Sequence, residues 1–139
     1  RIDTVDTAGL SPEWLPTRRP GNFEISGMME VRFTSNSSVL LRDAGGDEPL
    51  TISVNSANHE WHIQESVGRA VRSDGRRDDG RLTLQSELTG GLVDSLLRSG
   101  GCGLPTLAES VDLHRPFLSA MLDHWRATGH PGAQSVPIT

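Results

Sequence analysis

The segment FEISGMMEVRF, residues 23–33, decides the fold of this chain. Its odd-numbered positions are mostly apolar, and Glu24, Ser26, Glu30 and Arg32 stand between them. Successive side chains of a β-strand point to opposite faces, so this period of two predicts one long strand with a single buried face.

Shorter segments of the same kind, separated by polar turns, each predict a further strand: residues 39–43, 50–56, 59–65, 68–72 and 81–86. The first 22 residues indicate a short strand and an irregular, proline-rich connection. The segment SDGRRDDG, residues 73–80, is typical of a charged turn. Six strands joined by short connections predict an antiparallel meander whose apolar face needs a cover.

Two segments with helical spacing are expected to supply that cover. The first, residues 86–101, has Ser86 as its N-cap, Gly100 as its stop, and leucines or valine at positions 88, 92, 93 and 96. Its Gly90–Gly91 pair predicts close packing of the helix backbone on the sheet. Strands followed by helices predict one α+β domain over residues 1–139: a mostly antiparallel open sheet of about six strands, one face covered by two or three helices.

The second helical segment runs from Thr106 to Trp125. Thr106 and Glu109 match a capping box, in which each side chain satisfies a backbone amide of the other residue. The expected core stripe consists of Val111, Leu118, Leu122 and Trp125, with Phe117 and Met121 beside it. On this interpretation Leu118→Asp unfolds the domain. Pro116 removes one amide donor and predicts a kink or a break into two helices.

Composition excludes several mechanisms. The net charge of -5 disfavours a nucleic-acid partner, because phosphate binding needs a basic surface. All 13 basic residues are arginine, and tyrosine is absent as well. The chain therefore has no Schiff-base lysine, lysine base or phosphate-loop lysine, and arginine stays protonated and cannot replace them.

Other features bear on the location of the protein. No run of eighteen apolar residues predicts a membrane span, and the first ten residues do not match a signal peptide. The one cysteine, Cys102, reads as an unreactive loop thiol and fits a reducing, cytoplasmic compartment. Because the sequence begins at Arg1 rather than Met, we expect a fragment, a processed product or a trimmed chain.

Motifs do not identify a catalytic centre. In HEWHIQE, His59 and His62 are three apart on a predicted strand, so they point to opposite faces and cannot share a zinc ion. His114 is predicted to be a half-buried, hydrogen-bonded packing residue. No catalytic, cofactor-binding or metal-binding residue is therefore predicted.

Three arginines are the candidate substrate-binding residues. Arg18 and Arg19 lie in a loop stiffened by Pro16 and Pro20, where they can hold a carboxylate, a phosphate or sugar hydroxyls. The alternative is a solvated basic loop. Arg115 can bind an anionic ligand or cap a nearby carbonyl group.

From residue 23 onward the chain resembles the C-terminal domain of the Gfo/Idh/MocA (glucose-fructose oxidoreductase / inositol dehydrogenase) family. The resemblance includes FEISGMMEVRF, LTISV and RLTLQSELTGGLVDSLL. Its most specific parts are GLPTLAESVDLHRPFLSAMLDHW, residues 103–125, and the closing VPIT. The family members are two-domain sugar or polyol dehydrogenases that use NAD or NADP.

The resemblance implies what this chain lacks. The family has a Rossmann half with a glycine fingerprint, a catalytic lysine in a Glu-Lys-Pro motif, and an Asp/His pair on a helix before the sheet. None of these is present here, so no catalytic residue is carried over. The implied function is the substrate-side and oligomerisation domain of an NAD(P)-dependent oxidoreductase, inactive alone and separated from its cofactor-binding domain.

The resemblance also implies a homo-oligomer through the open face of the sheet. The side chains expected on that face are Glu24, Ser26, Met28, Glu30, Arg32, Thr51, Ser53, Glu60, His62 and Gln64. Interspersed opposite charges suit a two-fold contact, but equally suit a face in solvent. The alternative function is a stand-alone oligomerising or small-ligand-binding module without enzymatic activity. Substrate, cofactor preference and oligomer size stay open.

Overall fold

A computed structural model describes residues 1–45, 48–56, 58–80 and 85–137. The elements are β1 (Ile2–Leu10), β2 (Leu15–Pro16), β3 (Phe23–Glu24), β4 (Gly27–Phe33), β5 (Ser38–Asp43), β6 (Thr51–Ser56), β7 (His59–Gln64), the 3-10 turn η1 (Glu65–Val67), β8 (Arg69–Arg72), β9 (Arg77–Asp79), α1 (Gln85–Ser99) and α2 (Leu107–Ala127).

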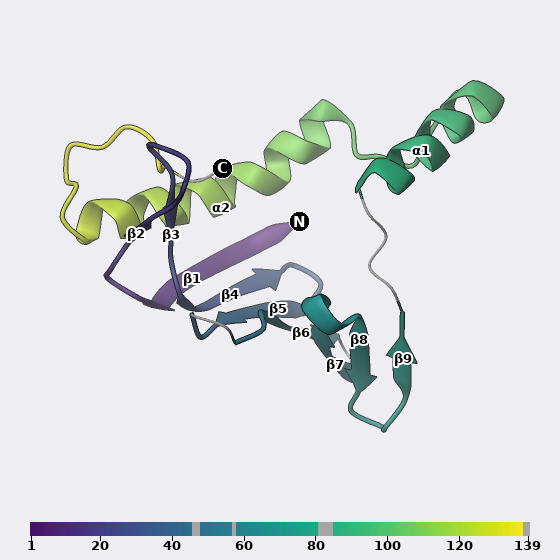
Figure 1. Cartoon of the computed structure of the whole chain (residues 1–139), viewed down its shortest axis with the longest axis horizontal. Helices are drawn as coiled ribbons and strands as arrows, with labels where there is room; N and C mark the ends of the chain where they lie inside the picture. Colours follow the sequence, from purple (N-terminus) through teal and green to yellow (C-terminus); the bar gives the residue numbers. More distant parts are fainter. Residues whose placement is uncertain (46–47, 57, 81–84, 138–139) are drawn as a thin grey trace.

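The elements form an α+β fold with an open antiparallel sheet, as predicted (Figure 1). Seven strands make the main sheet in the order β1-β4-β5-β6-β7-β8-β9, and β2 and β3 form a separate pair. From β4 to β9 each strand pairs with the next one in sequence, which is the predicted meander.

The strand predicted over residues 23–33 is interrupted. Residues 23–24 form β3 and pair with β2, and β4 begins only at Gly27. Gly27 has φ 118°, and a Cβ there would lie against the carbonyl oxygen of Gly9 and 2.7 Å from the Cα of Leu10. Position 27 therefore requires glycine, because it pairs closely with Leu10 at the end of β1 and any side chain would collide with that strand.

Three further predictions differ from the structure. The expected short N-terminal strand is the nine-residue β1, whose pairing with β4 has two irregularities. The expected charged turn, residues 73–80, contains β9, whose Arg77–Asp79 pair with β8. Of the strand predicted over residues 81–86, positions 81–84 lie outside the described residues, and Gln85 and Ser86 belong to α1, so Ser86 is not an N-cap.

The sheet has one apolar face. The register aligns Val5, Met29, Val31, Val39, Leu41, Ile52, Val54, Trp61, Ile63 and Ala70 on it. α2 lies over β1 on this side (Figure 1). Met29 and Val31 are buried, whereas the apolar side chains of β6 and β7 are only half-buried. The core is therefore concentrated under α2.

An aromatic cluster ties the end of α2 to the N-terminal segment. Trp125 stacks on His130 with ring centroids 3.4 Å apart, meets Trp14 edge-on at 4.8 Å, and contacts Phe23 at 5.4 Å. The indole N–H of Trp14 donates to the hydroxyl of Thr128 at 3.0 Å. The cluster fixes β2, β3 and the C-terminal segment around the last turns of α2.

α2 begins as predicted. The Thr106 hydroxyl accepts from the Glu109 amide at 3.2 Å, and the Glu109 carboxylate accepts from the Thr106 amide at 2.7 Å. The second bond, together with one from the Thr106 hydroxyl, lowers the pKa of Glu109. The predicted break at Pro116 does not occur, since α2 is one helix from Leu107 to Ala127.

No helix in the described part of the chain is long and apolar enough to cross a membrane.

The predicted core stripe of α2 is the wrong one. Met121, 3% exposed, and Phe117 face the sheet, whereas Leu118 is 41% exposed and Val111 is exposed as well. Only Trp125 of the predicted stripe is buried, with Leu122 half-buried. α2 therefore carries two adjacent apolar stripes, and the sheet covers only one of them.

The predicted cover by the first helix is also wrong. α1 lies at the far end of the molecule from β2 and β3 (Figure 1). Its Leu88 and Leu96 are 53% exposed and its Leu97 is 79% exposed. A Cβ on Gly90 or Gly91 would meet nothing within 4 Å among the described residues, so this glycine pair does not allow a close approach to the sheet.

Candidate functional site

The open face of the sheet carries most of its charged side chains. The register places on this polar face Asp6, Met28, Glu30, Arg32, Ser38, Leu40, Arg42, Thr51, Ser53, Asn55, Glu60, His62, Gln64, Arg69, Val71, Arg77 and Asp79. Eight of the ten predicted members are among them. Glu24 and Ser26 are not, because Glu24 belongs to β3 and Ser26 lies between the strands.

The polar face is electrically balanced. It has as many carboxylates, on Asp6, Glu30, Glu60 and Asp79, as guanidinium groups, on Arg32, Arg42, Arg69 and Arg77. The chain as a whole has a net charge of -5. A neutral surface of mixed charges does not repel a second copy of itself, which favours a self-complementary contact.

A serine, a histidine and a glutamate meet in the middle of this face. The Ser53 hydroxyl and Nδ1 of His62 share a hydrogen bond of 2.9 Å, and Nε2 of His62 lies 3.6 Å from the Glu60 carboxylate. β6 is an interior strand, so its backbone N–H groups pair with β5 and β7. These backbone amides are therefore not available to stabilise an oxyanion, and the three side chains form a polar ladder across β6 and β7.

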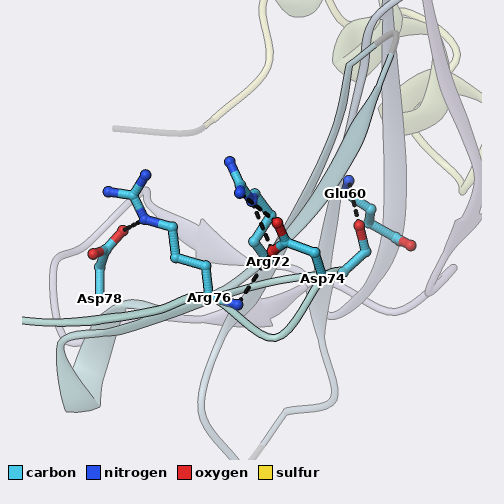
Figure 2. Close-up of polar contacts among 6 residues, drawn as sticks. Glu60, Arg72, Asp74, Arg76 and Asp78 are labelled. Atoms are coloured by element: carbon cyan, nitrogen blue, oxygen red, sulfur yellow. Dashed lines mark hydrogen bonds and ion pairs between the residues drawn. The ribbon is translucent and has the colours of Figure 1, made fainter.

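The hairpin of β8 and β9 is rich in ion pairs (Figure 2). Arg72 binds Asp74 through two nitrogens, and Arg76 lies 3.3 Å from Asp78. The bonds from the Arg72 guanidinium hold the pKa of the Asp74 carboxyl far below its usual value, and the Arg76 amide at 3.2 Å acts in the same direction. These pairs neutralise both arginines.

The guanidinium groups of this hairpin also cover an aromatic ring. Arg72 and Arg76 lie 5.6 and 5.8 Å from the centre of the Trp61 ring. The backbone amide of Glu60 donates to the Ser73 hydroxyl at 3.3 Å, which holds the turn against β7 (Figure 2). Sequence reasoning missed this cluster because it depends on the β7–β8 register. These contacts hold the β8–β9 turn against β7, and each charged group in them already has a partner.

Arg115 lies beside a groove on α2. The groove, of about 660 Å³, lies between α2 and residues 134–136, and Val111, Leu118 and Leu122 contribute its apolar lining. His114, on the same rim, donates from Nδ1 to the Ser110 carbonyl at 2.7 Å. His114 is therefore hydrogen-bonded as predicted, but it is exposed rather than half-buried.

Arg18 and Arg19 lie in the connection between β2 and β3. They line a hollow of about 330 Å³ together with Thr17, Asn22 and Glu24. Sequence reasoning did not select Thr17, Asn22 or Glu24, although the Pro-Gly turn before Asn22 indicates that the chain folds back there. The hollow shares no lining residue with the groove at Arg115, so the three candidate arginines do not form one site.

The histidines and the cysteine do not form a metal site. No group of three or more potential ligands is present among the described residues. His62 pairs with Ser53 on the polar face and His59 lies on the other face of β7, which confirms their predicted separation. Cys102 lies in the connection between α1 and α2 as a free, half-buried thiol.

Comparisons of this chain with protein-family models, with curated proteins and with solved structures find no match.

Proposed function

We propose that this chain is the substrate-side and oligomerisation domain of an NAD(P)-dependent sugar or polyol oxidoreductase of the Gfo/Idh/MocA type, catalytically incomplete without a separate Rossmann domain. The proposal starts from the resemblance of residues 23–139 to that family. The observed α+β fold with an open antiparallel sheet agrees with the fold that this resemblance implies. We further propose a reducing, cytoplasmic location from the single cysteine.

The observation that carries the proposal is the amount of apolar helix surface left uncovered. On α1, Leu88, Val93, Leu96 and Leu97 are more than half exposed, and on α2 the stripe through Leu107, Val111 and Leu118 is exposed. Large apolar side chains exposed along a helix in this way are typical of a contact with another protein surface. A cofactor-binding domain docked on these helices supplies that contact, and it brings the lysine and nucleotide cradle that the 139 residues lack.

The cofactor-binding half provides a direct test. The coding sequence upstream of Arg1 is expected to encode a glycine fingerprint followed by a lysine motif. Calorimetry is expected to show NAD or NADP binding by the longer protein and none by this chain alone, because residues 1–139 have no phosphate-binding loop. An upstream sequence without the fingerprint, or a polyol oxidised by this chain alone, contradicts the proposal.

The second part of the proposal is a two-fold dimer through the polar face. Arg42 is exposed on this face and forms no ion pair with the described residues. Arg42→Glu is therefore expected to raise the dimer dissociation constant at least about tenfold in sedimentation equilibrium, because both copies carry the reversed charge. A monomeric unaltered chain contradicts the dimer.

The matched control is Arg115→Glu. Arg115 is also exposed and unpaired among the described residues, but it lies on α2, away from the polar face. An equal loss of association in both variants would mean that net charge, and not this face, controls the dimer.

The balanced polar face also favours a second candidate, a stand-alone oligomerising or small-ligand-binding module. It predicts the same dimer, but no fingerprint upstream and no nicotinamide binding by the natural protein.

A further inference from the structure

The connection between β2 and β3 is held in one shape. The Thr17 amide donates to the Asn22 carbonyl at 3.0 Å, and the Asn22 amide donates to the Arg19 carbonyl at 3.1 Å. The Thr17 hydroxyl accepts from the Arg19 amide at 3.1 Å. A loop that is already ordered loses little conformational entropy when a ligand binds, so its polar groups are available at low cost.

The base of this loop is attached to the rest of the domain at two points. The Trp14 indole donates to Thr128 at 3.0 Å, and the Phe23 amide donates to the Pro137 carbonyl at 3.1 Å. Trp14 and Phe23 both contact the buried Trp125. The two arginines thus lie in a loop whose base is anchored to the aromatic cluster around Trp125.

Arg18 and Arg19 differ from most arginines of this chain because neither forms an ion pair within the described part of the structure. Ion pairs occupy the guanidinium groups of Arg32, Arg69, Arg72, Arg76, Arg77, Arg98 and Arg126. Arg18 and Arg19 form none with the described residues, although acidic residues exceed basic ones in the chain. Two adjacent free guanidinium groups bind an oxyanion through charge-assisted hydrogen bonds.

The other groups that line the hollow select what the oxyanion is attached to. Glu24 contributes a carboxylate, which repels a bare anion and accepts hydrogen bonds from hydroxyl groups. The Asn22 side chain can both donate and accept, whereas the Thr17 hydroxyl is already bound to the Arg19 backbone. No large apolar side chain lines the hollow, and its volume of about 330 Å³ suits a small polar molecule.

We propose that the hollow formed by Thr17, Arg18, Arg19, Asn22 and Glu24 binds a polyhydroxylated ligand with one phosphate or carboxylate group, as in a sugar phosphate or a sugar acid. The guanidinium groups of Arg18 and Arg19 hold the anionic group, and Glu24 and Asn22 hold the hydroxyl groups. This inference deepens the proposed function by naming a substrate class. It rests on that proposal only in treating the ligand as a substrate.

The test is calorimetric titration of the 139-residue chain with four probes: glucose 6-phosphate, gluconate, inorganic phosphate and glucose. Glucose 6-phosphate or gluconate is expected to bind at least about tenfold more tightly than glucose or inorganic phosphate, since only these two engage both sets of groups. The tighter of the two identifies the anionic group as phosphate or carboxylate.

Substitutions in the loop connect the binding to these residues. Arg18→Gln with Arg19→Gln is expected to weaken binding of the tighter probe at least about tenfold. Glu24→Gln is expected to weaken it too, but to strengthen binding of inorganic phosphate, because it removes the repulsion. Arg1→Gln is the matched control: this arginine is also exposed, forms no ion pair with the described residues and does not line the hollow, so its loss is expected to leave the affinity for every probe unchanged. Circular dichroism confirms that each variant is folded.

Several results overturn the inference: no saturable binding of either hydroxylated anion, equal affinity for inorganic phosphate, or equal losses in the arginine double variant and in Arg1→Gln. Because no nicotinamide takes part, this outcome is independent of the proposed oxidoreductase function. If the chain binds glucose 6-phosphate but the natural protein has no cofactor-binding domain, the ligand site stands and only the oxidoreductase function is contradicted.

Discussion

Trp125→Ala is expected to lower the free energy of unfolding by about 3–5 kcal/mol, the usual cost of removing a buried aromatic side chain. Trp125 is 7% exposed and contacts Trp14, Phe23 and His130. Its loss removes the centre of the cluster that joins α2 to β2, β3 and the C-terminal segment. Because the free energy of unfolding of small domains is only about 5–15 kcal/mol in total, this loss is a large part of the stability, and we expect a much lower urea midpoint.

The measurement is urea denaturation followed by far-ultraviolet circular dichroism, since the substitution itself alters tryptophan fluorescence. The control is Leu97→Ala on α1, which removes an apolar side chain that is already 79% exposed. We expect this control to change the free energy of unfolding by less than about 0.5 kcal/mol. Similar midpoints for Trp125→Ala and the unaltered chain would mean that the aromatic cluster does not stabilise the fold.

Met121→Asp is expected to unfold the domain, whereas Leu118→Asp is expected to be tolerated. Met121 is 3% exposed and lies with Phe117 against Met29 and Leu41 of the sheet. A carboxylate placed there loses its hydration and gains no partner, at a cost of several kcal/mol. The same group at position 118 stays in contact with water, because Leu118 lines an open groove.

Arg115 supports the second half of this prediction. It is three residues before Leu118 on the same helix, so a carboxylate introduced at position 118 lies beside a guanidinium group. Far-ultraviolet circular dichroism and thermal unfolding of both variants provide the check. If Leu118→Asp unfolds the chain as readily as Met121→Asp, the second apolar stripe of α2 is part of the core, as the sequence first suggested.

On α2 the sequence pattern predicted the wrong apolar stripe as the one that faces the sheet. Val111, Leu118 and Leu122 have the same helical spacing as the residues that face the sheet, and one helix can present both sets. Periodicity identifies an amphipathic helix, but does not reveal which of two adjacent apolar stripes meets the sheet. Contact between α2 and β1 makes that choice.

The same limit applies to α1. Its leucine spacing predicted a helix correctly, and the helix is present, but the pattern says only that an apolar surface exists. In this structure that surface is largely exposed.

The β8–β9 hairpin shows the opposite case. Arg77, Asp78 and Asp79 have no apolar alternation, and they form a strand because β8 offers a free edge to pair with.

For the candidate site, sequence alone selected Arg18, Arg19 and Arg115 as cations outside any recognisable motif. It did not place Arg115 apart from the other two, or bring Asn22 and Glu24 beside Arg18 and Arg19. Those placements depend on how β3 folds back on β2 and on the position of residues 134–136.

The sequence by itself determined the local features of this protein. These are the alternation that makes β4 and its neighbours strands, the Thr106–Glu109 capping box, and the absence of lysine. They depend on residues close in the chain or on composition. Only the tertiary structure decided the break before Gly27, the buried stripe of α2 and the lack of an ion pair between Arg18 or Arg19 and any described residue. Each of these is set by which distant segments pack together, and close packing and ion pairing act between neighbours in space.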